Sequence, residues 1–162
     1  MNYKKLFQMQ RALDQHIESN HALQSENVTD KKILALLVEL GELANETRCF
    51  KFWSVKGPAP REKILEEYVD GIHFILSLGL ELGFENSVPA TIEASTEEAT
   101  VQFIKMYETI IDFKNSQTAE LYVEMFKEYL QLGQILGFSA NDIERAYVEK
   151  NEINFQRQNQ GY

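Results

Sequence analysis

Cysteine, proline and long apolar runs are all scarce in this sequence. Its 162 residues include a single cysteine, Cys49, so the chain cannot form an intramolecular disulfide, which favours a reducing compartment. No apolar run approaches the ~20 residues of a membrane-spanning helix. Residues 1–15 mix polar and apolar side chains, unlike a secretory signal peptide. We therefore expect a cytoplasmic protein that does not enter a membrane.

Basic residues are also in deficit. The chain has 16 Lys and Arg against 25 Asp and Glu, and its formal net charge is −9. This excess of negative charge argues against general binding to nucleic acids or to anionic membrane surfaces. An anionic substrate remains compatible with such a chain if metal ions neutralise the site.

Only three prolines interrupt the chain, and the alternation of apolar and polar residues that is typical of strands is rare. The hydrophobic share of 44% and the length suit one domain with a substantial core. We predict an all-α fold, a bundle of about six helices that forms a single domain over residues 1–162. The first three helices are expected over about 3–19, 29–50 and 60–83, and three more follow after residues 94, 116 and 138.

Several of the expected helix starts carry capping residues. Thr29 is placed to cap the second helix, and Ser95 with Glu98 has the spacing of a capping box for the fourth. Ser139 with Asp142 is expected to start the last helix, which leads into a polar tail over residues 151–162. Residues 85–94 are expected to form a connection.

Two acidic pairs stand out because each lies in an otherwise apolar segment. The first pair is Glu39 and Glu42, and the second is Glu67 and Asp70. Side chains three residues apart share one face of a helix, so each pair points two carboxylates the same way. Glu46 extends the first strip by one turn. Apolar residues cover the other sides of both segments, which predicts two buried helices.

Buried carboxylates without cationic partners must be protonated, paired or bound to metal. No Lys or Arg lies between Lys32 and Arg48, so the first strip lacks a local counter-charge. Oxygen-only ligands favour Mg²⁺, or Mn²⁺, over zinc or copper. We therefore predict that the four carboxylates meet and bind hard divalent cations. The alternative is an acidic face that is simply solvated.

A multi-metal carboxylate site suits phosphoryl or nucleotidyl displacement, because the ions stabilise both the attacking and the leaving oxygens. A carboxylate that is not fully used as a ligand can orient the attacking water as a general base. Asp70 and His73 also have the acid-x-x-His spacing of di-iron helical bundles, but those sites use two such motifs and no second histidine stands near Glu39. His73 is better interpreted as a core residue or as support for the ligands.

Two further segments are candidates for contact with a nucleotide. Lys150, Asn154 and Arg157 recur at helical spacing, with Asn151 beside them, and this polar stripe suits a triphosphate. A solvated tail helix would show the same spacing. Trp53, the only tryptophan, lies in a loop beside two lysines, where it either stacks on a base or plugs the core.

One internal repeat is present. Residues 76–84 read Leu-Ser-Leu-Gly-Leu-Glu-Leu-Gly-Phe, and residues 130–138 read Leu-Gln-Leu-Gly-Gln-Ile-Leu-Gly-Phe, 54 positions later. Either a helical hairpin was duplicated, or two helices converged on the same Leu/Gly ending. In a duplicated hairpin Leu121 and Glu124 would stand opposite Glu67 and Asp70, so the second copy would have lost its acid pair.

Taken with these motifs, the sequence resembles the all-α nucleoside triphosphate pyrophosphatases, the group that includes MazG and the dimeric dUTPases. The ExxE and ExxD pairs that mark this superfamily match the two acid pairs. The finer resemblance is to dimeric dUTPases, and it extends over most of the chain. It rests on Leu13-Asp14-x-x-Ile17, Phe52-Trp53-Ser54 and Lys150-Asn151-x-x-Asn154-x-x-Arg157-Gln158-x-x-Gly161-Tyr162.

The resemblance implies a homodimeric enzyme that hydrolyses dUTP to dUMP and pyrophosphate by attack of water at the α-phosphorus, with dUDP as a further candidate substrate. It implies Mg²⁺ ligands at Glu39, Glu42, Glu67 and Asp70, with Glu42 orienting the water. It implies phosphate contacts from Lys150, Asn154 and Arg157, and nucleotide or nucleoside contacts from Asn151, Gln10, Asp14 and Trp53.

One departure bears on the choice of base. The family often carries Asn near the position of Asp14, so the contact with the pyrimidine there, and with it the selectivity for uracil, is less secure than the pyrophosphatase chemistry. A related enzyme that acts on dCTP or another nucleotide is the nearest alternative. A non-catalytic helical interaction protein, whose acidic strips face solvent or a basic partner, is the alternative from a different class.

Overall fold

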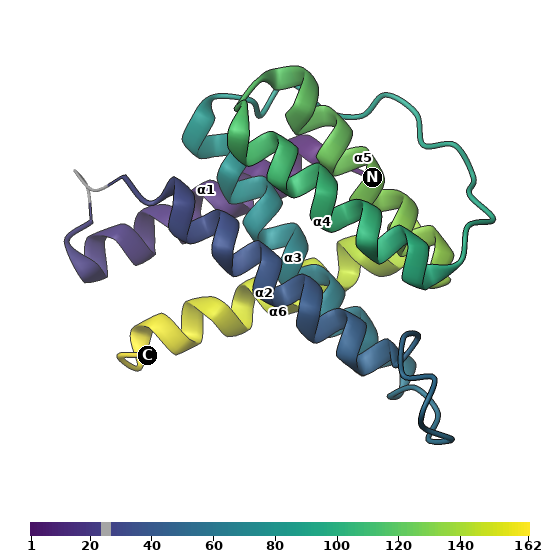
Figure 1. Ribbon diagram of the computed structural model, residues 1–162. Helices are drawn as coiled ribbons and strands as arrows, with labels where there is room; N and C mark the ends of the chain where they lie inside the picture. Colours follow the sequence, from purple (N-terminus) through teal and green to yellow (C-terminus); the bar gives the residue numbers. More distant parts are fainter. Residues whose placement is uncertain (24–26) are drawn as a thin grey trace.

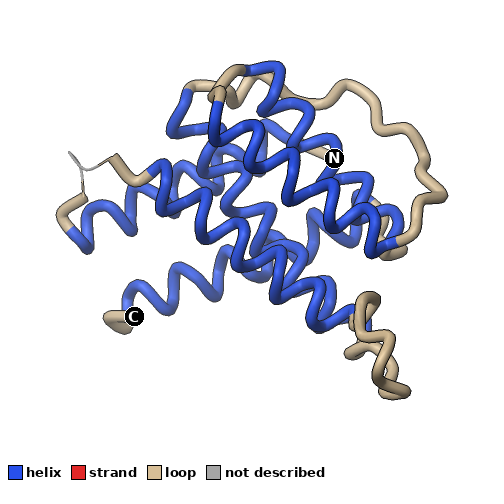
Figure 2. The backbone as a smooth tube through the Cα atoms, in the orientation of Figure 1, coloured by secondary structure: helices blue, strands red, loops and turns tan. Residues whose placement is uncertain are grey.

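The computed structural model describes residues 1–23 and 27–162, and within these ranges it contains six α-helices and no strand (Figures 1 and 2). The predicted all-α fold is confirmed. No helix in the described ranges is both long enough and apolar enough to cross a bilayer. The helices are α1 (Tyr3–His21), α2 (Thr29–Thr47), α3 (Arg61–Leu82), α4 (Ala99–Asn115), α5 (Ala119–Ile135) and α6 (Ala140–Asn159).

Helix α3 is the centre of the bundle. It packs against α1, α2, α5 and α6, while α4 packs against α2 and α5 (Figure 1). Because its apolar residues recur around nearly the whole circumference, α3 is buried on most sides, as the sequence predicts. Two helical hairpins, α2–α3 and α4–α5, thus make up the body of the molecule, and α1 and α6 cover α3.

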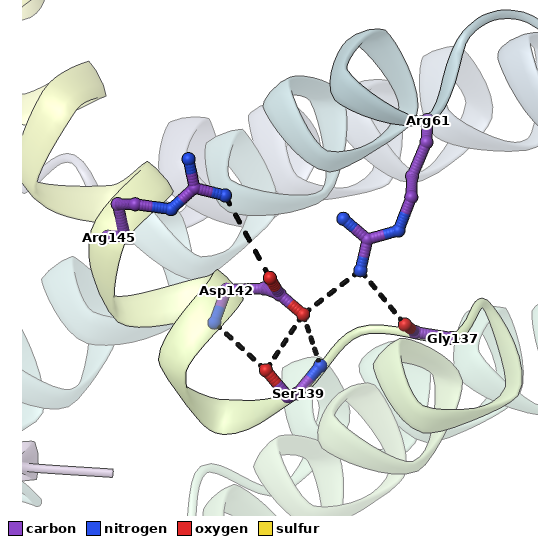
Figure 3. Close-up of polar contacts among 5 residues, drawn as sticks. All are labelled: Arg61, Gly137, Ser139, Asp142 and Arg145. Atoms are coloured by element: carbon purple, nitrogen blue, oxygen red, sulfur yellow. Dashed lines mark hydrogen bonds and ion pairs between the residues drawn. The ribbon is translucent and has the colours of Figure 1, made fainter.

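The start of α6 is fixed by the predicted capping residues. The Ser139 hydroxyl accepts a hydrogen bond from the backbone N–H of Asp142, and the Asp142 carboxylate accepts one from the backbone N–H of Ser139. Arg61, the first residue of α3, donates to the same carboxylate at 2.9 Å and to the carbonyl of Gly137 at 3.1 Å (Figure 3). These bonds join the first turns of α3 and α6, so the N-terminal ends of the two helices lie next to each other.

The predicted cap at Thr29 and the predicted capping box at Ser95 are wrong. Thr29 is already the first helical residue of α2, and its backbone N–H donates to the side chain of Asn27. Ser95 lies ahead of α4, which begins at Ala99, and its hydroxyl oxygen accepts a hydrogen bond from a backbone N–H two residues on. Both residues have a suitable side chain, but neither stands at the position from which it can reach the first helical turn.

Two helix ends also differ from the prediction. Helix α2 ends at Thr47 rather than near residue 50, because Arg48 adopts a left-handed conformation with φ of 58° and its N–H donates to the carbonyl of Ala44. Helix α6 continues to Asn159, so most of the segment predicted as a polar tail is helical.

The internal repeat ends α3 and α5 in the same way. Gly83 and Gly137 both have positive φ, 74° and 83°, which glycine adopts without strain. The N–H of the phenylalanine that follows donates back to the carbonyl of Gly79 in the first case and of Gly133 in the second. Both helices therefore close with the same Schellman-type bond.

The repeat also governs how α3 and α5 pack on each other. The Tyr68 hydroxyl of α3 donates to the carbonyl of Tyr129 on α5, and the Tyr122 hydroxyl of α5 donates to the carbonyl of Ile75 on α3. The two donors, Tyr68 and Tyr122, are 54 positions apart, and so are the two acceptors, Ile75 and Tyr129. Each helix therefore donates to the other through equivalent positions of the repeat. Such reciprocal packing favours a duplicated hairpin over convergence on a common helix ending.

Candidate active site

Three carboxylates from the two acid pairs come together between α2 and α3. One oxygen each of Glu39, Glu67 and Asp70 lies within 4.8 Å of the others. Glu67 is buried, and Glu39 and Asp70 are half-buried. The hairpin produces this arrangement because the acidic strip of α2 turns towards that of α3. We call Glu39, Glu67 and Asp70 the carboxylate cluster.

Glu42 lies beside the carboxylate cluster rather than in it. Its side chain is exposed and lines a recess of about 410 Å³, together with Glu46, Glu67 and Asn45. Its charge still raises the pKa of Glu39, so the two carboxylates interact. The structure thus separates the first acid pair, with Glu39 facing α3 and Glu42 facing the recess.

Burial and crowding make the carboxylate cluster hard to ionise. Burial, together with the charges of Asp70, Glu42 and Glu67, raises the pKa of Glu39 to about 7. Burial likewise raises the pKa of Asp70, although a hydrogen bond from Lys150 opposes the change. The carboxylate cluster therefore carries more negative charge than the neighbouring cationic side chains neutralise.

Two lysines supply part of the counter-charge, and both come from outside α2. Lys63 forms an ion pair with Glu67. The Lys150 ammonium lies 2.9 Å from Oε1 of Glu66 and 2.9 Å from Oδ2 of Asp70. Burial alone would lower the pKa of Lys150, but these two carboxylates reverse the effect and raise it.

Glu66 is a site residue that the motif analysis missed. Its hydrogen bond from Lys150 lowers its pKa, which marks it as the ionised partner of that lysine. The spacing carried a signal, because Glu66 precedes Asp70 by four residues and so lies on the same face of α3.

The donor set fits a hard divalent cation. The five carboxylates around the cluster, Glu39, Glu42, Glu66, Glu67 and Asp70, face two lysines, Lys63 and Lys150. The oxygens within 4.8 Å of one another all belong to carboxylates, and the group includes no histidine of the described ranges. A di-iron site with histidine ligands is therefore not supported, and an oxygen-ligated ion such as Mg²⁺ is.

A buried polar network adjoins the cluster. The Gln10 amide donates to Oδ1 of Asp14 at 2.8 Å, and the Ser77 hydroxyl donates to Oδ2 of the same carboxylate at 2.8 Å. The Gln10 carbonyl oxygen lies 2.8 Å from Nδ1 of His73 and accepts a hydrogen bond from the Tyr147 hydroxyl at 2.7 Å. Gln10 is thus held by α3 and α6 at His73, one turn along α3 from Asp70, and Asp14 is held at Ser77, two turns along α3.

The remaining predicted site residues divide by location. On α6, Asn151 is buried next to Lys150, Asn154 is half-buried, and Arg157 is exposed, with its guanidinium 5.5 Å from the ring centre of Tyr162. Of the predicted phosphate stripe, the structure therefore brings Lys150 into the site.

Trp53 does not plug the core, so that interpretation is wrong. Its side chain is 64% exposed and meets Phe50 and Phe52 edge to face. It lies on the loop between α2 and α3, which projects from the body of the bundle (Figure 1).

The fold and the site together define a class of all-helical proteins with an acidic centre, between two helices of a hairpin, that is suited to a divalent cation. Within that class the sequence matches the family model described as dUTPase over residues 2–162, and the chain belongs to this family. It is an enzyme, a dUTP diphosphatase, and the alternative of a non-catalytic interaction protein is set aside. No curated protein matches the sequence.

Proposed function

We propose that the protein hydrolyses dUTP to dUMP and pyrophosphate in a Mg²⁺-dependent reaction, with water attacking the α-phosphorus, and that residues 1–162 act as one catalytic domain. The observation that carries the proposal is the carboxylate cluster in a chain of the dUTPase family. Glu39, Glu67 and Asp70 would hold the ion. Bound there, Mg²⁺ would neutralise the crowded carboxylates and polarise the phosphate oxygens.

Glu42 is the proposed general base. It faces the recess, is exposed, and belongs to the same strip of α2 as Glu39. A carboxylate in this position can orient a water molecule and hold the proton that the water loses on attack. Glu46 lines the same recess one turn further along α2 and is the natural control for this assignment.

The substrate contacts follow from the remaining predicted residues. Lys150 would exchange one of its carboxylate partners for a phosphate oxygen, because a bound cation would weaken the ion pairs of its ammonium with Glu66 and Asp70. Asn154 and Arg157 would take the outer phosphates, and Gln10, Asp14, Asn151 and Trp53 would lie near the nucleoside.

Pyrophosphate release from a panel of dUTP, dUDP, dCTP and the other deoxynucleotides, with Mg²⁺, Mn²⁺ or EDTA, tests the proposal. We expect dUTP turnover that EDTA abolishes and Mg²⁺ restores. Turnover that persists in EDTA would reject the metal requirement, and preference for dCTP would reject the choice of base. In ¹⁸O-labelled water the label should enter dUMP; label in pyrophosphate would reject attack at the α-phosphorus.

We also propose that the enzyme is a homodimer that associates through α2 and α4. These two helices lie side by side on one face (Figure 1), and the Tyr107 hydroxyl of α4 donates to the carbonyl of Leu37 on α2. Large apolar side chains on them are left exposed: Leu34, Val38, Val101, Ile104, Tyr107 and Ile111. Contiguous apolar patches on two helices are typical of protein–protein contacts.

The position of this face supports a second copy of the chain as its occupant. Val38 belongs both to the apolar face and to the recess that contains Glu42. A partner seated on α2 and α4 would therefore border the site and could complete its wall. The exposed apolar face and its continuity with the recess therefore support α2 and α4 as the surface of the proposed dimer.

A further inference from the structure

Two buried nitrogen atoms beside the carboxylate cluster lack a hydrogen-bond partner. Of the three such side-chain atoms in the described residues, Nε2 of His73 and Nδ2 of Asn151 lie here. His73 is 5% exposed and Asn151 is 4% exposed. His73 follows Asp70 by one turn of α3, and Asn151 follows Lys150, whose ammonium bonds to Asp70. Buried polar atoms are rarely left unpaired, so both atoms point to a ligand.

The protein fixes which nitrogen of His73 carries the proton. The amide nitrogen of Gln10 donates to Asp14, so the carbonyl oxygen of Gln10 is the atom that faces His73. That oxygen can only accept, and therefore Nδ1 of His73 donates to it. The neutral ring then has a lone pair at Nε2, which makes this atom an obligate acceptor.

Two observations keep the ring neutral and in place. Burial, together with the charge of Lys150, lowers the pKa of His73 to about 3. The imidazole also stacks on the ring of Tyr147 with centroids 4.2 Å apart, and the Tyr147 hydroxyl donates to the same Gln10 oxygen. The ring is therefore held both by stacking and by a shared acceptor.

We propose that Nε2 of His73 accepts the imide N–H of the uracil base and thereby selects dUTP against dCTP. This inference rests on the proposed function. A dUTP molecule offers two kinds of donor, the imide N3–H and the 3′-hydroxyl. The unpaired Nδ2 of Asn151 would donate to a neighbouring carbonyl oxygen of the base.

The fixed tautomer favours the base over the sugar. A hydroxyl can donate or accept, so a histidine that can only accept would bind the 3′-hydroxyl of every deoxynucleotide equally and would not distinguish one from another. The N3 atom of a pyrimidine cannot switch roles in this way. It is a donor in uracil and an acceptor in cytosine, so an obligate acceptor pairs with the first and repels the second. Sites that read a polar group in this manner discriminate strongly.

Kinetics with modified nucleotides test the assignment. The wild-type enzyme should hydrolyse dUTP well and N3-methyl-dUTP poorly. In His73→Ala we expect kcat/KM for dUTP to fall about 10- to 100-fold, while kcat/KM for dCTP should rise because the repulsion between Nε2 and the N3 atom of cytosine is removed. His73→Gln should recover part of the dUTP activity and raise that on dCTP, because an amide can turn to accept or to donate.

Three kinetic outcomes would overturn the inference: equal losses on dUTP and dCTP, normal turnover of N3-methyl-dUTP, or an effect of His73→Ala that disappears with 2′,3′-dideoxyuridine triphosphate. The last outcome would assign His73 to the 3′-hydroxyl. Failure of the proposed function itself would look different, since wild-type protein would then show no EDTA-sensitive dUTP turnover.

A measurement on wild-type protein avoids dependence on the folding of the variants. The chain has three histidines, so ¹⁵N-histidine labelling gives few signals, and His73→Gln assigns those of His73. The free enzyme should show Nδ1 protonated and Nε2 bare. Adding dUMP, at a concentration that inhibits dUTP hydrolysis, should shift the Nε2 signal, and adding dCMP at the same concentration should not. A protonated Nε2, or no response to dUMP, would contradict the proposal.

Discussion

Glu39 is the residue whose charge the fold tolerates least. Its pKa rises from the ordinary 4.5 to about 7, so between these pH values the folded chain binds more protons than the unfolded chain. The metal-free protein should therefore lose stability as the pH rises from about 4.5 to 7. Urea unfolding in EDTA across this range would measure the effect.

Glu39→Gln is the matched control for this pH dependence. The amide occupies the same space and cannot titrate, so the fall in stability between pH 4.5 and 7 should become shallower. Asp70 contributes in the same direction, because burial raises its pKa too, and part of the slope should remain. An unchanged slope in the variant would show that Glu39 is not the group responsible.

Glu42→Gln should impair turnover without impairing the fold. The side chain is exposed and lines the recess, so its replacement removes a proton acceptor but little packing. We expect kcat to fall about 10²- to 10⁴-fold, the range for loss of a general base, with little change in Tm. Glu46→Gln in the same recess should retain most activity. Parallel losses of kcat and Tm in Glu42→Gln would indicate a structural role instead.

At the residue scale, spacing alone predicted the carboxylate cluster only in part. Three-residue spacing placed Glu39 with Glu42 and Glu67 with Asp70, and it correctly paired the two strips. It could not predict that Glu42 would face the recess, because the rotation of α2 against α3 depends on core packing. Spacing also could not predict the counter-charge from Lys150, because Lys150 lies on α6, about 80 positions after the acidic residues of α3 that it contacts.

At the scale of helices, the crossing of α3 and α5 depends on glycines. A Cβ atom at Gly133 would lie 2.5 Å from the Tyr68 hydroxyl oxygen and 2.7 Å from its Cζ atom. That hydroxyl donates to a buried carbonyl of α5, so the ring cannot move aside without losing the bond. We expect Gly133→Ala to destabilise the protein by about 1–3 kcal/mol, as measured by urea unfolding.

Gly57→Ala is the control for this substitution. Residue 57 lies on the loop between α2 and α3, and a Cβ atom there would meet no atom within 4 Å. Its stability should stay close to wild type. Equal stability of the Gly133 and Gly57 variants would mean that α3 and α5 can separate at little cost.

The sequence predicted the helices better than their ends. Helical periodicity is repeated over many residues, so it survives local exceptions and gave the correct number of elements. An N-terminal helix cap, by contrast, depends on a single residue and on the direction in which the preceding chain leads into the helix. Ser139 satisfied both conditions, helped by Arg61 from another helix, whereas Ser95 had the right spacing but lay one turn too early.

Contacts between distant helices decide most of what the whole molecule can do. The network from Ser77 through Asp14 and Gln10 to His73 and Tyr147 joins α1, α3 and α6. The sequence pointed to Gln10 and Asp14 only through the resemblance, and His73 was interpreted there as a core or supporting residue. Only the packing of three helices shows that its Nε2 atom is left unpaired.

The apolar face of α2 and α4 gives the last prediction, which concerns assembly. Adding charge at its two most exposed side chains, with Leu34→Glu and Ile104→Glu together, should convert a dimer into a monomer, because desolvating two carboxylates opposes association. Sedimentation velocity would measure this. Since Val38 joins the face to the recess that contains Glu42, the monomer should also have a lower kcat/KM for dUTP.

Val55→Glu is the matched control, because Val55 is fully exposed on the loop between α2 and α3, away from the apolar face. This substitution should leave both the oligomeric state in sedimentation velocity and the dUTPase activity unchanged. A wild-type monomer would reject the dimer, and a dimer that survives the double substitution would move its interface elsewhere. A fully active monomeric variant would confirm the interface and show that each chain completes its own site.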